Sequence, residues 1–247
     1  MKNKYKCIIF DLDNTLLSYD LSAYEAIRIF LERYNIKDSS LEEVFIDMCN
    51  KLWTDFGLNR LKDPFIQKNY HELSEDYAIR RFEVFSPHLK GSMAKTKGAK
   101  ELSLEFDEIF ASCHIFEEGA LEVVEKLSKD HLIGIATNGL SRLQSKRAHP
   151  FSDYTDHLFV SQEIGHVKPL EDFYLHILKK TKMDVKDCLF IGDLYTTDIM
   201  GALNVKMDAC WYRPRAGEKE NFLEDNIDDY NKEVLQIRAL RDLLEHV

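Results

Sequence analysis

The stretch from Lys6 to Leu17, which reads KCIIFDLDNTLL, constrains the fold of this chain more than any other segment. A short, unbroken apolar run at positions 7–10 leads directly into Asp11 and Asp13. Such a run predicts a strand that is buried on both faces, as in a parallel sheet covered by helices. Because parallel sheets carry their chemistry at the carboxyl ends of strands, we expect a site at Asp11.

The acidic pair in this stretch allows two interpretations. Asp13 follows Asp11 by two positions, so in extended backbone both side chains would point the same way. Neighbouring carboxylates repel each other unless a positive charge joins them, and a divalent metal such as Mg2+, which prefers oxygen ligands, is the usual solution. The alternative is a capped loop, because Asp and Asn favour turns and Thr15 could begin a helix. Taken alone, the DxDxT pattern leaves both interpretations open.

The remaining chain divides into two patterns. From about residue 16 to residue 114 the apolar spacing is helical, with no convincing strand and with Pro64 interrupting one segment. Helices are expected there over 20–34, 40–56, 75–85 and 97–112. After residue 114 strands and helices alternate, which is typical of a parallel sheet with right-handed crossovers. Strands are expected over 132–136, 157–160, 188–191, 208–212 and 233–237. Helices are expected over 120–129, 141–148, 169–180, 197–203 and 239–245, the third of them opened by Pro169.

These patterns predict an α/β protein with a Rossmann-like, doubly wound parallel sheet core and an inserted all-helical cap domain. The core is expected to comprise residues 1–15 and 115–247, and the cap residues 16–114. The formal net charge of -10, without a basic footprint, argues against a nucleic-acid polymer as partner. The five scattered cysteines fit a reducing, cytoplasmic setting. No apolar stretch reaches the length of a membrane span or a signal peptide, so no membrane association is expected.

Polar residues follow other predicted strands and would converge with Asp11 at one sheet edge. They are Thr137, Asn138, Lys168, Asp193 and Asp198. Each has an ordinary explanation by itself: a turn, a solvated lysine, or an acid at a helix start. Together they could serve phosphoryl transfer. One carboxylate would attack phosphorus, a second carboxyl would move protons, and the hydroxyl, amide and ammonium groups would bind the phosphoryl oxygens.

Four segments, DLDNT, TNG, KP and GDLYTTD, resemble the four motifs of the haloacid dehalogenase-like hydrolases, and the resemblance covers nearly the whole chain. It implies that Asp11 is the nucleophile and Asp13 the general acid/base. Thr137 and Asn138 would bind phosphate, and Lys168 would steady the nucleophile and the phosphoryl group. The helical insertion matches the helical cap of this family.

The same resemblance implies a Mg2+ cofactor. Its ligands would be Asp11, Asp193 and the backbone carbonyl of Asp13, with Asp198 acting from behind these ligands or through water. Asp13 also narrows the reaction, because the dehalogenase branch of the family lacks this second Asp. A phosphatase or a phosphomutase is left, and of these we expect a phosphomonoester hydrolase with an aspartyl-phosphate intermediate.

A finer resemblance is to the bacterial pyrimidine 5′-nucleotidase branch. It rests on Asn14 and on the segments TNGLSRLQ, SQEIGHVKP and DACWYRP. It implies a small-molecule nucleoside monophosphate as substrate, and a monomer or homodimer. Leu194 after the GD pair and Lys206 at an expected turn glycine depart from the pattern. A sugar phosphatase or β-phosphoglucomutase-like enzyme, and a catalytically silent binding module, are the alternatives.

The cap is expected to set substrate specificity by closing on the core. Tyr19, Trp53 and Phe56 could stack on a base. The favoured alternative is that Trp53 and Phe56 face the cap's own core, because aromatic residues at helical spacing are mostly core residues. Arg60 or Arg80 could meet a distal charge on the substrate.

Overall fold

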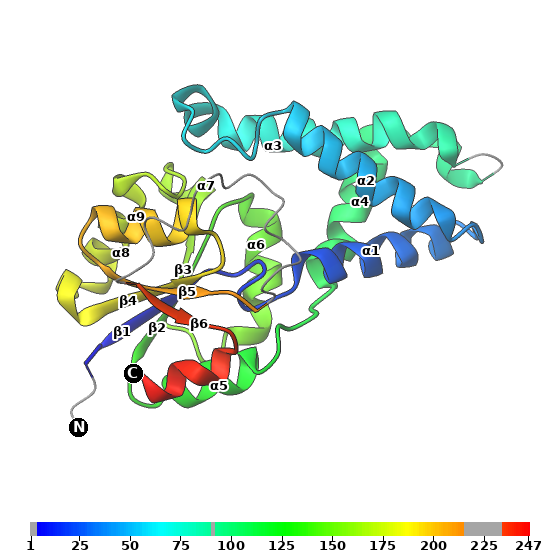
Figure 1. Cartoon of the computed structure of the whole chain (residues 1–247). Coiled ribbons are helices and arrows are strands. Elements are labelled where there is room, and N and C mark those ends of the chain that lie inside the picture. Colours follow the sequence, from blue (N-terminus) through cyan, green and yellow to red (C-terminus); the bar gives the residue numbers. More distant parts are fainter. Residues whose placement is uncertain (1–3, 90–91, 215–233) are drawn as a thin grey trace.

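A computed structural model describes residues 4–89, 92–214 and 234–247 of the chain. Its centre is a six-stranded sheet in which every pairing is parallel, with the strand order β3-β2-β1-β4-β5-β6 (Figure 1). The strands are β1 (Cys7–Phe10), β2 (Leu132–Thr137), β3 (His157–Val160), β4 (Cys188–Gly192), β5 (Asp208–Tyr212) and β6 (Leu235–Ile237). The predicted fold class is confirmed; residue 233, which the prediction included in the last strand, lies outside the described residues.

The position of β1 explains where a site can form. It pairs with β2 on one side and β4 on the other, and the chain fills the β2 side before it crosses to the β4 side. The direction of strand order therefore reverses beside β1. In open parallel sheets such a reversal leaves a crevice at the carboxyl ends of the strands, because the flanking connections depart to opposite faces.

Helices cover both faces of the sheet, as alternation along β1 requires. Ile8 and Phe10 face one apolar cluster and Cys7 and Ile9 face the other. The first cluster is closed by α5 (Ala120–Leu127) and the short turns η3 (His149–Phe151) and η7 (Leu240–Glu245). The second is closed by α8 (Glu171–Thr181), the π-helical turn η5 (Tyr195–Ile199) and α9 (Met200–Asn204). Because side chains alternate between the two faces of the sheet and both faces are buried, the sheet forms the middle layer between two layers of helices.

Between β1 and α5 the chain forms four longer helices around an apolar core of their own (Figure 1). They are α1 (Tyr19–Arg33), α2 (Ser40–Asp55), α3 (Pro64–Phe85) and α4 (Ala99–Ser112). Their core holds Phe30, Phe45, Phe82 and Phe106, all buried. A smaller cluster joins the start of α3 to Val167 of the sheet unit, so the helices also cover part of that unit.

Four expectations about individual elements were wrong. Pro64 begins α3 instead of interrupting it, since a proline is tolerated at the first helical position and the Asp63 carboxylate caps the helix by accepting from the Phe65 N–H (2.9 Å). Pro169 precedes α8, which begins at Glu171. The helix expected over 197–203 is split into η5 and α9, and the closing helix is a 3-10 turn.

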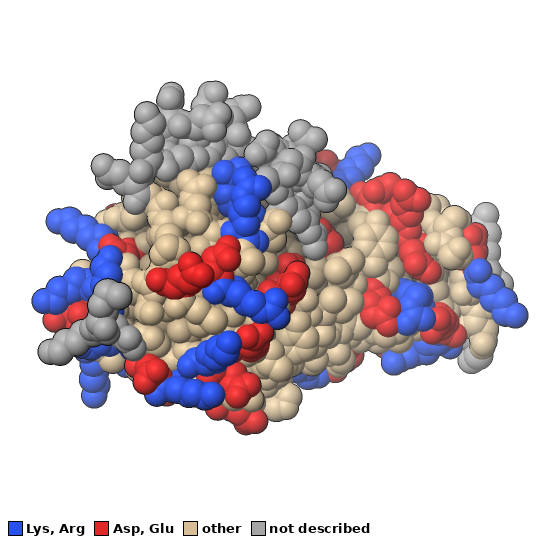
Figure 2. Space-filling view, turned by 60° about the horizontal axis from the view of Figure 1, so that its bottom comes forward, with Lys and Arg blue, Asp and Glu red and all other residues tan. Residues whose placement is uncertain are grey.

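Two further elements adjoin the site. These are α6 (Ser141–Ala148), as predicted, and α7 (Ser161–Ile164), which was not predicted. The surface that Figure 2 brings forward carries acidic and basic side chains mixed together. Pairs such as Lys126–Glu122 and Arg241–Glu122, at 2.8 and 2.9 Å, explain such mixing. None of the helices in the described part of the chain has both the length and the apolar character of a membrane span.

Candidate active site

A buried lysine lies at the centre of the polar crevice beside β1. The Lys168 Nζ donates to Asp11 Oδ1 at 2.5 Å and to Asp198 Oδ1 at 2.7 Å, and it also donates to the Ala136 carbonyl oxygen at 3.1 Å. All three charged side chains are at least nine-tenths buried. Asp11 is fixed in turn by its own N–H, which donates to the Ile191 carbonyl oxygen (2.8 Å) and extends the β1–β4 ladder by one residue. Residues from three separate segments therefore meet at one point.

Three carboxyl groups gather at this lysine. One oxygen each of Asp11, Asp193 and Asp198 lies within 4.8 Å of the others. Gly192 permits this approach, because a Cβ at that position would collide with the Asp198 carboxyl group. The Leu194 N–H donates to Asp198 Oδ2 (3.0 Å), and Trp211 Nε1 donates to the Asp193 carbonyl oxygen (2.8 Å).

The electrostatics of this cluster fit a divalent cation. Burial raises the pKa of the Asp11 carboxyl to about 7, although Lys168 lowers it. Burial also raises the pKa of Asp193 well above its usual range, and Asp11 and Asp198 raise it further. The acidic groups in turn keep the pKa of Lys168 above its usual value despite its burial. One ammonium therefore does not offset three carboxylates, and the oxygen donors are those that Mg2+ prefers.

The Asn138 side chain is engaged by the Lys168 backbone. Its Nδ2 donates to the Lys168 carbonyl oxygen (3.0 Å), and its Oδ1 accepts from the Lys168 N–H (2.8 Å). The carboxamide thus holds the lysine's backbone from both sides, a role that sequence reasoning did not foresee. Thr137, buried at the end of β2, donates through Oγ1 to the Asn138 carbonyl oxygen at 3.3 Å, which is a long hydrogen bond.

The carboxyl groups of Asp13 and Asp11 have different partners. That of Asp13 is absent from the cluster of three and is instead held by α6. Asp13 Oδ1 accepts from Arg147 Nη2 at 2.6 Å and Nε at 3.0 Å, and Oδ2 accepts from Gln144 Nε2 at 2.9 Å. The strand β1 ends at Phe10, Leu12 lies in a bend and Asn14 has a φ of 63°, so Asp13 does not belong to a regular strand. Sequence reasoning missed Arg147 and Gln144, although Gln144 ends the segment TNGLSRLQ that carried the finer resemblance.

The helical insertion covers one side of the crevice. His71 of α3 lies 2.9 Å from Ser161 Oγ of α7, and Ser161 Oγ in turn accepts from the Gly139 N–H (3.0 Å) next to Asn138. The pKa of Tyr70 is raised by burial, lowered by the Lys168 ammonium and raised by Asp13, so this α3 residue lies within electrostatic reach of both. Trp53 is half-buried and packs edge-on against Tyr77, with ring centroids 5.3 Å apart. It belongs to the small cluster that includes Val167 of the sheet unit, and not to the main core of the insertion.

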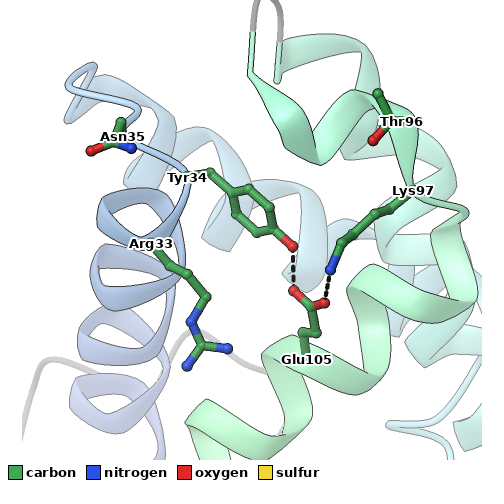
Figure 3. A pocket seen from close by; sticks show the side chains of 6 residues that line it. All are labelled: Arg33, Tyr34, Asn35, Thr96, Lys97 and Glu105. Atoms are coloured by element: carbon green, nitrogen blue, oxygen red, sulfur yellow. Dashed lines mark hydrogen bonds and ion pairs between the residues drawn. The ribbon is translucent and has the colours of Figure 1, made fainter.

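A separate hollow of about 370 Å3 lies elsewhere, at the end of α1 where it faces the start of α4 (Figure 3). It is lined by Arg33, Tyr34, Asn35, Thr96, Lys97 and Glu105. Three of its polar groups pair with one another, since Glu105 accepts from both Tyr34 and Lys97. It holds one carboxylate and is lined only by residues of the helical insertion, so it shares nothing with the site at β1.

Comparisons with known proteins identify the family. The family model of the haloacid dehalogenase-like hydrolases matches residues 5–206. This range includes β1, the crevice residues and the helical insertion. The chain belongs to the haloacid dehalogenase-like hydrolases.

Individual relatives are distant in sequence. The pyrimidine 5′-nucleotidase PynA of Streptococcus pneumoniae is 25% identical over 248 residues and 98% of each chain. The pyrimidine 5′-nucleotidase YjjG of Escherichia coli is 28% identical over 212 residues, covering 84% of this chain and 86% of that protein. The magnesium-bound crystal structure of the HAD-hydrolase YfnB of Bacillus subtilis superposes with a TM-score of 0.75 at 21% identity and covers 99% of both chains. The last likeness concerns the fold.

Proposed function

We propose that this hydrolase is a magnesium-dependent phosphatase that acts through an aspartyl-phosphate, with pyrimidine nucleoside 5′-monophosphates as its substrates. The observation that carries the reaction type is the buried Lys168 bridging Asp11 and Asp198, with Asp193 completing the acidic cluster. The observation that supports the substrate class is the similarity, over most of the chain, to two pyrimidine 5′-nucleotidases.

The proposed reaction has two balanced steps. An Asp11 carboxylate oxygen attacks phosphorus, the bond from phosphorus to the ester oxygen breaks, and the leaving alkoxide takes a proton from the Asp13 carboxyl group. A water molecule then attacks the aspartyl-phosphate and gives its proton to Asp13. The bond between phosphorus and Asp11 breaks, which releases inorganic phosphate and restores both side chains.

The other residues bind and orient the phosphate. Lys168 holds the Asp11 carboxylate and would contact a phosphoryl oxygen, and the Thr137 hydroxyl and the backbone N–H of Asn138 would donate to others. Asp11, Asp193 and the Asp13 backbone carbonyl would hold Mg2+, with Asp198 beside them. When bound, the ion offsets the negative charge that would otherwise keep nucleophile and phosphate apart.

We also propose that residues 16–114 act as a cap over a core made of residues 1–15 and 115–247. The packing of Tyr70 of α3 in one apolar cluster with Val167, the residue before Lys168, supports this. A cap in this position would exclude water from the phosphoryl group and contact the leaving nucleoside.

The test is phosphate release from a panel of nucleoside monophosphates and sugar phosphates, with Mg2+ and with EDTA. We expect Mg2+-dependent release concentrated on pyrimidine monophosphates. The Asp11→Asn variant should lose on the order of 10³-fold or more in kcat. The matched control is Asp208→Asn, because Asp208 lies at the amino end of β5, whereas the site lies at the carboxyl ends of the strands, and it pairs with Lys4.

Three results would contradict the proposal in different ways. An Asp11→Asn variant as active as the wild type would exclude the covalent step. Equal rates with and without EDTA would exclude the metal. A strong preference for a sugar phosphate would leave the reaction intact and replace the substrate class.

A further inference from the structure

We propose that Arg147, assisted by Gln144, is the positioning residue for Asp13, and that it ties the orientation of this acid/base group to the helical insertion. The proposal rests on the function proposed above, because it assigns a supporting role within the same reaction. It is carried by a contact that neither the family motifs nor the acidic cluster explains: both carboxyl oxygens of Asp13 accept hydrogen bonds from α6.

Hydrogen bonds hold both carboxyl oxygens of Asp13. Arg147 approaches Oδ1 with two nitrogens, and Gln144 approaches Oδ2 with one. Gln144 Nε2 also donates to the Asn138 carbonyl oxygen at 3.1 Å, so the same amide connects Asp13 to the end of β2. A carboxyl group on a loop would otherwise sample several rotamers, and a proton transfer is efficient only within a narrow range of geometry.

The burial of Arg147 also points to this contact. Arg147 is fully buried, and among the ion pairs of the described residues its carboxylate partner is Asp13. Removing a guanidinium from water is costly unless a carboxylate and hydrogen bonds compensate. The ion pair between Arg147 and Asp13 is therefore buried within the structure, unlike a surface ion pair that lies near the site by chance.

The far side of the same guanidinium contacts the helical insertion. Its carbon lies 4.3 Å from the ring centroid of Phe110, and Nη1 donates to the Phe110 carbonyl oxygen at 3.4 Å. Phe110 belongs to the last turn of α4, immediately before the chain returns to the core. One side chain therefore joins the end of α4 to Asp13, so a shift of α4 relative to α6 changes the support of the acid/base group.

The test uses the chemistry of the leaving group. The uridine leaving group of uridine 5′-monophosphate is an alkoxide, which needs a proton, whereas 4-nitrophenyl phosphate releases a stable phenolate that does not. In Arg147→Met we expect kcat/KM to fall about 100-fold for the nucleotide and less than about fivefold for the aryl ester. Arg147→Lys should recover part of the loss, and Gln144→Met should show a smaller selective loss.

Controls separate positioning from folding. Arg142→Met is matched, because Arg142 also lies on α6 and pairs with Asp107 and Glu75 of the helical insertion, but does not touch Asp13. Its ratio of the two kcat/KM values should equal that of the wild type. In an Asp13→Asn background, Arg147→Met should add no further selective loss. If Arg147→Met does not fold, Gln144→Met carries the same measurement.

The outcomes distinguish this proposal from the one it rests on. Equal losses on both substrates, or no loss, in both Arg147→Met and Gln144→Met would overturn the positioning role. If Asp13→Asn itself showed no selective loss on the nucleotide, the acid/base assignment would fail first, and the proposed function would need revision before the role of Arg147.

Discussion

Different interactions stabilise the sheet unit and the helical insertion. In the sheet, backbone pairing sets the position of each residue, and the alternation of side chains along β1 places Ile8 and Ile9 on opposite faces. In the insertion, aromatic rings set the packing: Phe45 lies 5.5 Å from Phe82 and 4.9 Å from Phe106, measured between ring centroids. The carboxylates of Asp11, Asp193 and Asp198 belong to the sheet unit, where hydrogen bonds fix the backbone. The helical insertion depends instead on the shapes of its side chains.

This difference predicts that the insertion is most sensitive to loss of ring volume. Phe82 is fully buried and contacts three other phenylalanines of its cluster within 5.2–5.7 Å between ring centroids. Phe82→Ala should lower the free energy of unfolding by about 3–5 kcal/mol, measured by urea denaturation, because truncation leaves a cavity among rings that cannot close it.

The control for that substitution is Phe65→Ala. Phe65 lies in the first turn of the same helix and is 64% exposed, so its loss should change the unfolding free energy by no more than about 0.5 kcal/mol. A Phe82→Ala variant as stable as Phe65→Ala would show that ring packing does not hold the insertion together.

A smaller effect is expected within the sheet unit, at Asn138 after β2. Its carboxamide makes two hydrogen bonds to the Lys168 backbone, and Asn138→Ala would leave both backbone groups without these partners. We expect kcat/KM for the preferred nucleotide to fall about 10- to 100-fold, corresponding to about 1–3 kcal/mol. KM for the substrate should change less than kcat, since Lys168 would be displaced from Asp11.

Asn69→Ala is the control for Asn138, because the Asn69 amide also donates to a backbone carbonyl oxygen, that of Phe65 (2.8 Å), but on an exposed stretch of α3. Equal activity of the two variants would mean that Lys168 keeps its place without the carboxamide.

Sequence reasoning succeeded where local pattern decides the structure. The apolar run before Asp11 was sufficient to predict β1. The polar residues near the later strands, taken together, predicted that Lys168, Asp193 and Asp198 would meet Asp11. Even the departure at Lys206 was informative: this residue adopts a φ of 63°, in the left-handed region where a glycine was expected.

Sequence reasoning failed where a residue distant in the chain determines how a side chain is held. The orientation of Asp13 depends on Arg147, which lies 134 positions away and carries no motif of its own in the sequence. The prediction for Pro64 was wrong for another reason. A proline that ends one helix and a proline that begins the next produce the same gap in apolar spacing.

The smallest effect is expected at a contact between the sheet unit and the insertion. His71 of α3 lies 2.9 Å from Ser161 of α7, and burial lowers its pKa below the ordinary value of about 6.5. Between that value and its lowered pKa, the unfolded chain takes up a proton that the folded protein refuses, so stability falls as the pH falls through this window. Replacing His71 with Gln removes that contribution.

We therefore expect the unfolding free energy of the wild type to drop more than that of His71→Gln when the pH is lowered from 7.5 to 5.5, by a difference under about 1 kcal/mol. The sign is the informative part, because a histidine stabilised as a cation at this contact would make the wild type gain stability over the same interval. Urea denaturation of both proteins at the two pH values measures it. A difference that does not change with pH would show that His71 is as free to titrate in the folded protein as in the unfolded chain, and that the contact between α3 and α7 opens readily to water.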